Sequence, residues 1–343
     1  MSALSADALE ARLARLPKVR LAALPTPLEP CPRLSAALGG PEIWVKRDDL
    51  TGLCFGGNKT RQLEYVFADL LAQGCDMVVA GAYTQSNWCR QMTAAARKLG
   101  LDIALVLLHG EKGPALQGNF LLFKLMGADV RVVDLPSIEQ LQPELERRAA
   151  ELRAAGRKPY VVAPMGLANL SLGALGYVQA AIELDRQIAA SGLSFDAIVL
   201  SGANMTPAGL ALGLNALGRT LRMINITPIR CAEDRPTDIA RIGNAAAARL
   251  GLEVRLRAAE IESHDEYIGE RYGVVTEGCR AALRLAAESE GLILDPVYSG
   301  KALAGLIDLV RRGRLTAAER VIFLHTGGTP ALFAYAEELG LAC

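Results

Sequence analysis

Lys59 is the residue whose surroundings most favour covalent chemistry. It follows Gly56, Gly57 and Asn58 at the start of a predicted helix. The glycines allow a ligand to approach the backbone closely, and the positive end of a helix favours loss of the ammonium proton. A neutral lysine amine at this position could attack an aldehyde. Taken alone, the motif also fits a solvated surface lysine after a glycine turn.

Two polar loops each follow a predicted buried strand and open a predicted helix. They cover residues 81–87 and 201–209. A strand, a loop and a helix N-terminus together form a place for an anion. We expect a carboxylate near Ser86 and Asn87, and a phosphate where backbone N–H groups and the Thr206 hydroxyl gather. Ordinary helix caps and connecting loops remain alternatives, and the loop at 201–209 matches no nucleotide-binding motif.

Tyrosines and small polar residues cluster again near the end of the chain. Tyr272 lies upstream of the segment 295–301, which contains Tyr298 and Ser299, and the segment 325–329 follows. Tyr298 also fits the core, because it follows an apolar segment.

The elements that must position these residues alternate along the chain. Apolar runs predict strands at 43–45, 77–80, 103–108, 130–133, 160–163, 197–200, 222–226 and 321–324. Helical stretches separate or follow these runs at 63–73, 87–99, 115–126, 173–190 and 210–217. This βαβ rhythm is typical of an α/β protein with parallel sheets covered on both faces. We predict two lobes, a small domain at 62–170 and a large domain from 1–61 and 171–343.

Composition excludes several classes of protein. Thirty-seven basic residues balance thirty-seven acidic ones, so no nucleic-acid partner is expected. We find no apolar run long enough to cross a membrane and no signal peptide, which together predict a cytoplasmic protein. Seven scattered cysteines predict reduced, mostly buried thiols. His264 lies among acidic residues without a second metal ligand nearby, so we expect a solvated loop and no metal.

Together these segments resemble the family of 1-aminocyclopropane-1-carboxylate deaminase and D-cysteine desulfhydrase. This family belongs to the tryptophan-synthase-β fold type, fold type II, among pyridoxal-5'-phosphate (PLP) enzymes. The resemblance runs from about residue 24 to residue 335. The matching motifs, in the family's order, are Lys46–Gly52, Gly56–Arg61, Gln85–Asn87, Tyr298–Lys301 and His325–Gly328.

The resemblance implies a role for each matching position. Lys59 corresponds to the Schiff-base lysine and proton shuttle, and Ser86, Tyr272 and Tyr298 are the other catalytic candidates. The implied contacts to PLP come from Asn58, Lys59, Asn87, Gly202, Ala203, Asn204, Met205, Thr206, Ser299 and Thr326. The implied contacts to a small amino-acid substrate come from Ser86, Asn87, Trp88 and Tyr298.

Ser299 guides the choice of reaction. It stands where the family has a residue facing the pyridine nitrogen, and the deaminases carry a glutamate there. A neutral hydroxyl suits loss of a β-substituent, so D-cysteine desulfhydration is the first expectation, with pyruvate and ammonia as products. L-cysteate sulfo-lyase and 1-aminocyclopropane-1-carboxylate deaminase are alternatives, as is a catalytically degenerate, ligand-binding member. The resemblance also implies a homodimer.

The sequence departs from the family at positions expected to face ligands. Trp88 replaces a histidine or glutamine and should reshape the substrate pocket. In the phosphate loop Asn204 and Met205 replace small residues, and Pro207 replaces a histidine or similar side chain. If a replaced glycine had positive φ, a methionine there would cost about 1 kcal/mol. With the lysine motif intact, we expect a divergent member with an unusual substrate.

Overall fold

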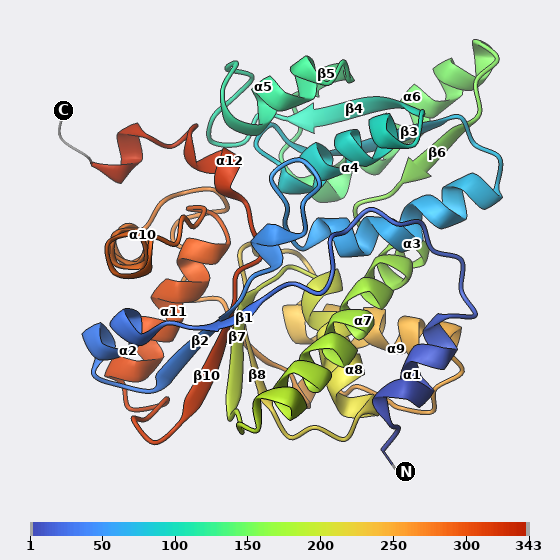
Figure 1. The fold of residues 1–343 in the computed structure, drawn as a ribbon. Helices are drawn as coiled ribbons and strands as arrows, with labels where there is room; N and C mark the ends of the chain where they lie inside the picture. Colours follow the sequence, from blue (N-terminus) through green and yellow to red (C-terminus); the bar gives the residue numbers. More distant parts are fainter. Residues whose placement is uncertain (1–2, 341–343) are drawn as a thin grey trace.

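A computed structural model describes residues 3–340 and contains two sheets (Figure 1). The smaller sheet contains β3 (Met77–Tyr83), β4 (Asp102–Leu108), β5 (Asp129–Val133) and β6 (Pro159–Val162), in the order β5-β4-β3-β6. All its neighbouring strands are parallel. This sheet comes from one continuous part of the chain.

The larger sheet is built from both ends of the chain. It has the order β1-β2-β10-β7-β8-β9. The strands are β1 (Leu28–Pro30), β2 (Glu42–Lys46), β7 (Ala197–Ser201), β8 (Arg222–Ile226), β9 (Glu262–His264) and β10 (Arg320–Leu324). Only the β1–β2 pair is antiparallel among its described strand pairs. The predicted α/β fold with two mostly parallel-sheet lobes is confirmed.

Helices connect the strands and cover both sheets. They are α1 (Ala6–Leu13), α2 (Pro32–Leu38), α3 (Lys59–Ala72), α4 (Asn87–Lys98), α5 (Gly118–Leu125), α6 (Gln142–Ala154), α7 (Leu167–Ser191), α8 (Met205–Ala216), α9 (Arg235–Arg249), α10 (Glu277–Glu290), α11 (Ser299–Arg311) and α12 (Thr329–Leu332). Short 3-10 turns occur at Asp48–Leu50, Ile138–Gln140, Ala258–Glu260 and Glu337–Leu339.

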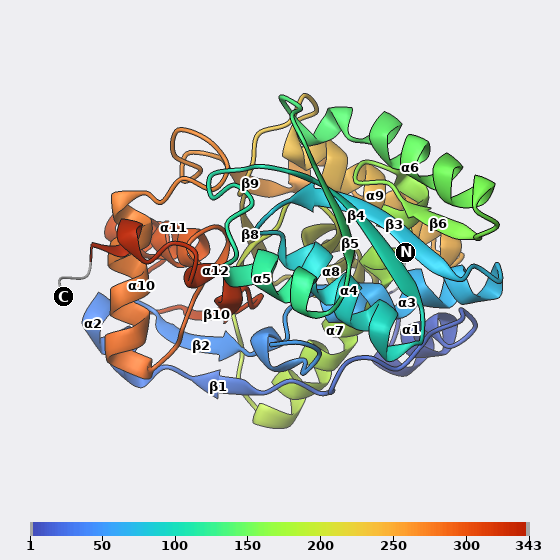
Figure 2. The ribbon, with the colours of Figure 1, turned by 90° about the horizontal axis from the view of Figure 1, so that it is seen from above.

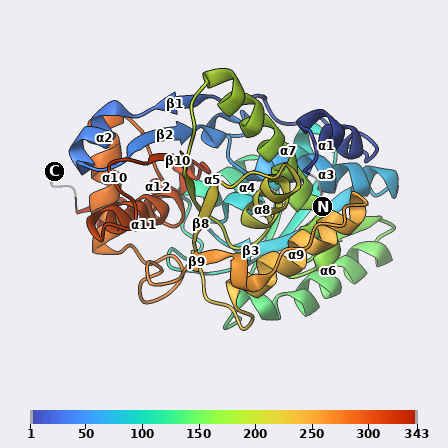
Figure 3. The same cartoon turned by 90° about the horizontal axis from the view of Figure 1, so that it is seen from below.

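Strand side chains alternate between two cores of the larger lobe. Ile198 and Leu200 of β7 pack in a core with α7, α8 and α9. Ala197 and Val199 point to the opposite face and pack with α10 and α11. Figure 3 shows these two helical layers on either side of the strands. Because successive strand residues face opposite sides, a strand covered on both faces reads as a continuous apolar run.

The smaller sheet is covered in the same way. Val78 and Ala80 of β3 pack in a core with residues of α3, α4 and α5, whereas Met77 and Val79 face α6. Figure 2 shows α6 on one side of β3 and β4, with α4 and α5 on the other. The strands of this sheet lie within 62–170, but the exact domain boundaries stay a prediction.

Two predicted helices begin earlier than expected. Helix α8 begins at Met205, inside the predicted 201–209 loop, because the Asn204 side chain caps the Met205 N–H. Pro207 is tolerated because the first-turn N–H groups of a helix have no intrahelical acceptor. Helix α7 begins at Leu167, ahead of the predicted Gly173.

Two smaller expectations need correction. His264 ends strand β9 and is half-buried between Glu262 and Glu266, with hydrogen bonds of 3.0 and 3.1 Å, so it is not in a solvated loop. The six described cysteines are all free, but only three are buried; Cys343 lies outside the described residues. Within residues 3–340 no helix is both long and apolar enough to span a membrane.

Candidate active site

The candidate site lies where strand ends from the two sheets meet. The carboxyl ends of β3 and β7 lead directly into the loops before α4 and α8. Loops at the carboxyl ends of parallel strands are the usual place for ligand sites in such folds. One cavity is lined by residues of both loops and by Lys59.

Eight of the predicted site residues line this cavity. They are Lys59, Ser86, Trp88, Ala203, Asn204, Met205, Tyr272 and Tyr298. The others are buried and do not line it, namely Asn58, Asn87, Gly202, Thr206, Ser299 and Thr326. The functional roles of both groups stay predictions.

Lys59 is the first residue of α3, as predicted, and is half-buried. Burial lowers the pKa of its ammonium group to about 8, although the Asp295 carboxylate opposes this shift. Desolvation disfavours the charged form of an amine. About a tenth of Lys59 is therefore neutral, and nucleophilic, at pH 7.

The glycines before Lys59 are required by close backbone contacts. A Cβ on Gly56, whose φ is 61°, would lie 1.9 Å from the Asp49 carbonyl oxygen, and a Cβ on Gly57, whose φ is 128°, would lie 3.1 Å from the Thr326 carbonyl oxygen. The Asn58 N–H also donates to the Thr326 carbonyl at 3.0 Å. These contacts attach the lysine segment to the loop after β10.

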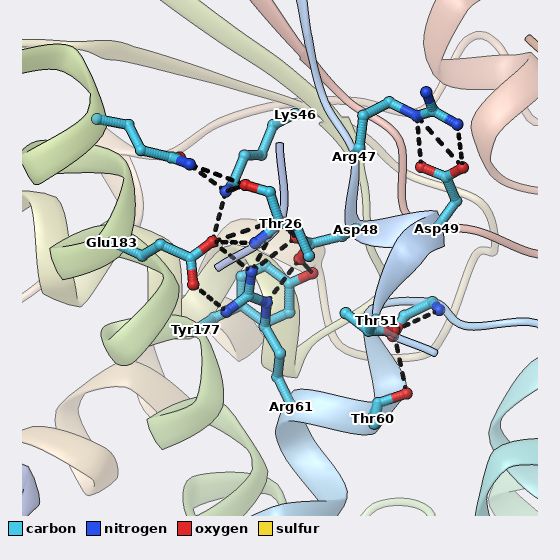
Figure 4. Close-up of polar contacts among 12 residues, drawn as sticks. Thr26, Lys46, Arg47, Asp48, Asp49, Thr51, Thr60, Arg61, Tyr177 and Glu183 are labelled. Atoms are coloured by element: carbon cyan, nitrogen blue, oxygen red, sulfur yellow. Dashed lines mark hydrogen bonds and ion pairs between the residues drawn. The ribbon is translucent and has the colours of Figure 1, made fainter. Parts of the chain in front are cut away.

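A buried ionic network fixes the other side of the lysine segment (Figure 4). Arg61 donates to Asp48 at 2.9 and 2.8 Å and to Glu183 at 3.0 and 2.9 Å. Tyr177 donates to Asp48 at 2.6 Å, and Lys46 pairs with Glu183. Burial alone would lower the pKa of Arg61, but the two carboxylates raise it well above its ordinary value. The network therefore holds the first turn of α3 rigidly.

Two tyrosines face Lys59 across the cavity. The Tyr272 and Tyr298 hydroxyls lie 3.0 Å apart, and the Lys59 Nζ lies 5.9 Å from the Tyr298 ring centroid. Tyr83 stacks on Tyr272 with ring centroids 4.8 Å apart. Burial raises the pKa of both Tyr272 and Tyr298. Both hydroxyls are therefore protonated at neutral pH and can donate a proton or a hydrogen bond.

The loop before α4 offers donors of hydrogen bonds. Ser86 caps α4 by accepting a bond from the Cys89 N–H at 3.1 Å, which leaves its own hydroxyl proton available. The Asn87 side-chain oxygen accepts from Asn119 at 2.8 Å, so its amide nitrogen is the group left to donate. Ser86 thus acts as a cap and also lines the cavity.

The loop before α8 has the donors that a phosphate requires. The backbone N–H groups of Ala203 and Asn204 make no hydrogen bond within the described protein. The Thr206 hydroxyl accepts bonds of 2.8 Å from Asn58 and Gln62, which leaves its proton free to donate. Such an array at a helix N-terminus suits an anion.

The replacements in this loop cause no left-handed backbone strain. Asn204 has a φ of −154°, and Met205 begins a helix. Among the described residues, the non-glycine residues with positive φ are Cys54 and Phe55. The condition for the expected strain is therefore not met. The Met205 sulfur instead occupies the space beside Gly173 in α7.

Ser299 is fully buried and bound to Asp295, a residue that sequence reasoning missed. The Asp295 carboxylate accepts from the Ser299 hydroxyl at 2.7 Å and from the backbone N–H groups of Val297, Tyr298 and Ser299. Asp295 stands four residues before the first residue of α11, and an acidic side chain just ahead of a helix could have signalled a partner for its first N–H groups.

Comparison with known proteins agrees with this geometry. The family described as "Pyridoxal-phosphate dependent enzyme" matches residues 19–327. The chain belongs to this family. A D-cysteine desulfhydrase from Serratia proteamaculans is 42% identical over 332 residues, which cover 95% of this chain and 98% of the relative.

Solved structures support the fold of this PLP-dependent family member. One described as an ACC deaminase homologue has a TM-score of 0.88 at 41% identity, covering 96% of this chain and 98% of that one. A threonine deaminase isoform from Solanum lycopersicum has a TM-score of 0.63 at 17% identity, covering 95% and 86%, and shows the fold alone.

The residues present in this PLP-dependent family member fit its cofactor. A lysine amine of lowered pKa is suited to the aldehyde, and the free N–H groups before α8 are suited to the phosphate. The Asn87 amide can donate to an oxygen on the ring.

Sequence reasoning missed Tyr83 and Arg235, which also line the cavity. Tyr83 follows a predicted strand, and the sequence predicts only that it lies in the loop at 81–87. Arg235 lies outside every predicted element and motif, so no sequence signal pointed to it.

Proposed function

We propose that this protein is a lyase that removes the β-substituent of a small amino acid, with D-cysteine as the first candidate. The overall reaction would convert D-cysteine and water into pyruvate, ammonia and hydrogen sulfide. The 3.0 Å Tyr272–Tyr298 pair facing Lys59 carries this proposal, because elimination requires a base at Cα and an acid at the leaving group.

The side chains around the cavity divide the work of this reaction. Lys59 would hold the cofactor, and its amine would take the proton from Cα. Tyr298, assisted by Tyr272, donates a proton to the departing sulfur. Ser86 and the N-terminus of α4 hold the substrate carboxylate. Bound PLP supplies an electron sink for the charge that develops at Cα.

The surroundings of Ser299 favour loss of a β-substituent over ring opening. By the family resemblance, Ser299 would face the pyridine nitrogen of the cofactor. The serine hydroxyl is neutral, whereas a carboxylate there would keep the ring protonated and strengthen electron withdrawal. Elimination of a thiol needs less withdrawal than opening an unactivated ring. D-cysteine therefore ranks ahead of 1-aminocyclopropane-1-carboxylate.

Titration of the purified holoprotein tests this function. D-cysteine, L-cysteine, L-cysteate and 1-aminocyclopropane-1-carboxylate are added separately while the cofactor absorbance and keto-acid release are followed. We expect a spectral change and pyruvate with D-cysteine, and neither with Lys59→Ala. Pyruvate from L-cysteate alone would make the protein a sulfo-lyase, and no response to any compound would favour a ligand-binding role.

We also propose a cytoplasmic homodimer. Apolar side chains are exposed on and beside the adjoining helices α5 and α12, namely Leu116, Leu121, Leu125 and Phe333. Exposed apolar side chains gathered in one region suit a contact between subunits. Light scattering after size-exclusion chromatography tests the dimer, and cell fractionation tests the location.

A further inference from the structure

Arg235 is a buried cation that the proposed reaction does not use. It begins α9, only 6% of its surface is exposed, and it lines the same cavity as Lys59. These two are the only lysine or arginine residues among the described residues that line the cavity, and no aspartate or glutamate lines it. The cavity is therefore suited to an anionic ligand.

The Arg235 guanidinium is held against the loop before α8. Its Nη1 donates to the Ala203 carbonyl at 2.9 Å and to Asp238 at 3.0 Å. Its Nη2 donates to the Glu233 carbonyl at 3.1 Å. Its Nε has no hydrogen-bond partner among the described residues. Because an arginine has five N–H donors, two of them remain for a ligand.

The charge of Asp238 is not used by Arg235 alone. This fully buried carboxylate is shared with Arg241, which reaches it from the other side. Arg241 pairs in addition with Glu233 at 3.3 Å. A buried charged group is unfavourable unless its N–H donors find hydrogen-bond acceptors. The Nε of Arg235 has none among the described residues, so we expect a bound ligand to supply the acceptor.

The position of Arg235 identifies that acceptor. The carbonyl that it contacts belongs to Ala203, whose own N–H is free and precedes the N-terminus of α8. Arginine binds phosphate through paired N–H groups. We propose that Arg235 is a ligand of the phosphate group of bound PLP, adding a positive charge to the backbone donors of residues 203 and 204. This inference rests on the proposed function, in which PLP binds with its phosphate at this loop.

Binding of PLP and of pyridoxal, which lacks the phosphate, tests the inference. Dissociation constants are measured by absorbance for the apoprotein and for Arg235→Gln. We expect the substitution to weaken PLP binding by about 10- to 100-fold, the usual effect of losing a hydrogen bond to a charged group. Pyridoxal binding should stay unchanged. Arg241→Gln is the matched control, because it shares Asp238 but does not line the cavity.

Each other outcome has a distinct meaning. An unchanged PLP constant would overturn the inference, as would an equal loss for PLP and pyridoxal. A wild-type protein that binds no PLP would instead remove the proposed function. If Arg235→Gln does not fold, Arg235→Lys in the holoprotein is compared by phosphorus NMR. A shifted phosphate signal relative to Arg241→Lys is expected, and an identical signal would overturn the inference.

Discussion

The Ser299 hydroxyl donates a 2.7 Å hydrogen bond to the Asp295 carboxylate and accepts a 2.8 Å bond from the Asp295 backbone N–H. Both bonds join Ser299 to the same residue, four positions earlier in the chain. Asp295 also binds the Tyr298 N–H at 3.0 Å, so one buried carboxylate positions both residues.

Asp295→Asn should destabilise the protein and displace Tyr298. Each oxygen of the Asp295 carboxylate accepts two hydrogen bonds. An amide nitrogen in place of either oxygen is itself a donor, so it would face two donors with no acceptor between them. We expect a loss of about 3 kcal/mol in the free energy of unfolding, measured in urea. Ser299→Ala is the comparison variant and should cost less, about 2 kcal/mol, because it removes the hydroxyl but leaves the three backbone N–H bonds to the Asp295 carboxylate in place. Equal stability of Asp295→Asn and wild type would contradict this role.

The pH dependence of cofactor capture should report the ionisation of Lys59. An amine attacks in its neutral form, and the lowered pKa of about 8 means that protonation blocks the attack below this pH. The rate of covalent PLP capture by the apoprotein should rise about tenfold per pH unit below the pKa and level off above it. Stopped-flow absorbance measures this rate. A midpoint near the ordinary lysine value, about 10.4, would argue against burial as the controlling factor.

Removal of either tyrosine hydroxyl should slow the chemical step and spare cofactor binding. We expect Tyr298→Phe to lower kcat by about 100-fold or more with D-cysteine, the usual contribution of a positioned acid or base. Tyr272→Phe should have a smaller effect, because Tyr272 acts through its 3.0 Å contact with Tyr298. Keto-acid release gives kcat, and the absorbance of bound PLP serves as the control. A fall in PLP occupancy that matches the fall in kcat would point to a structural role.

The buried network around Arg61 should be strongly coupled to stability. Arg61→Leu leaves Asp48 buried without its ionic partner and should lower the free energy of unfolding by about 3–5 kcal/mol. Arg47→Gln is the matched control, because it breaks pairs with the partly exposed Asp49 and Glu29 and should cost at most about 1 kcal/mol. The free energy of unfolding of each variant is measured in urea. Similar losses would show that the buried Arg61–Asp48 pair stabilises the protein no more than the partly exposed pairs of Arg47 do.

Much of the fold follows from local sequence patterns. The apolar runs ending at Ala80, Leu108 and Leu200 predict strands because their side chains fill cores on both faces of a sheet. The glycine pair before Lys59 predicts a helix start with close backbone contacts. These features depend on neighbours in the chain, so the sequence alone reveals them. The start of α8 at Met205 lies inside the predicted loop 201–209, and the first turn of a helix accepts Pro207.

The amino-acid sequence by itself determined the alternation of strands and helices and the segments where reactive side chains lie. Only the tertiary structure decided that Arg61 meets Glu183, that Tyr272 meets Tyr298, and that Arg235 lines the cavity of Lys59. The reason is that charge pairing and burial depend on which distant segments the sheets bring together. A single arginine in a sequence does not indicate whether water or a buried cavity surrounds it.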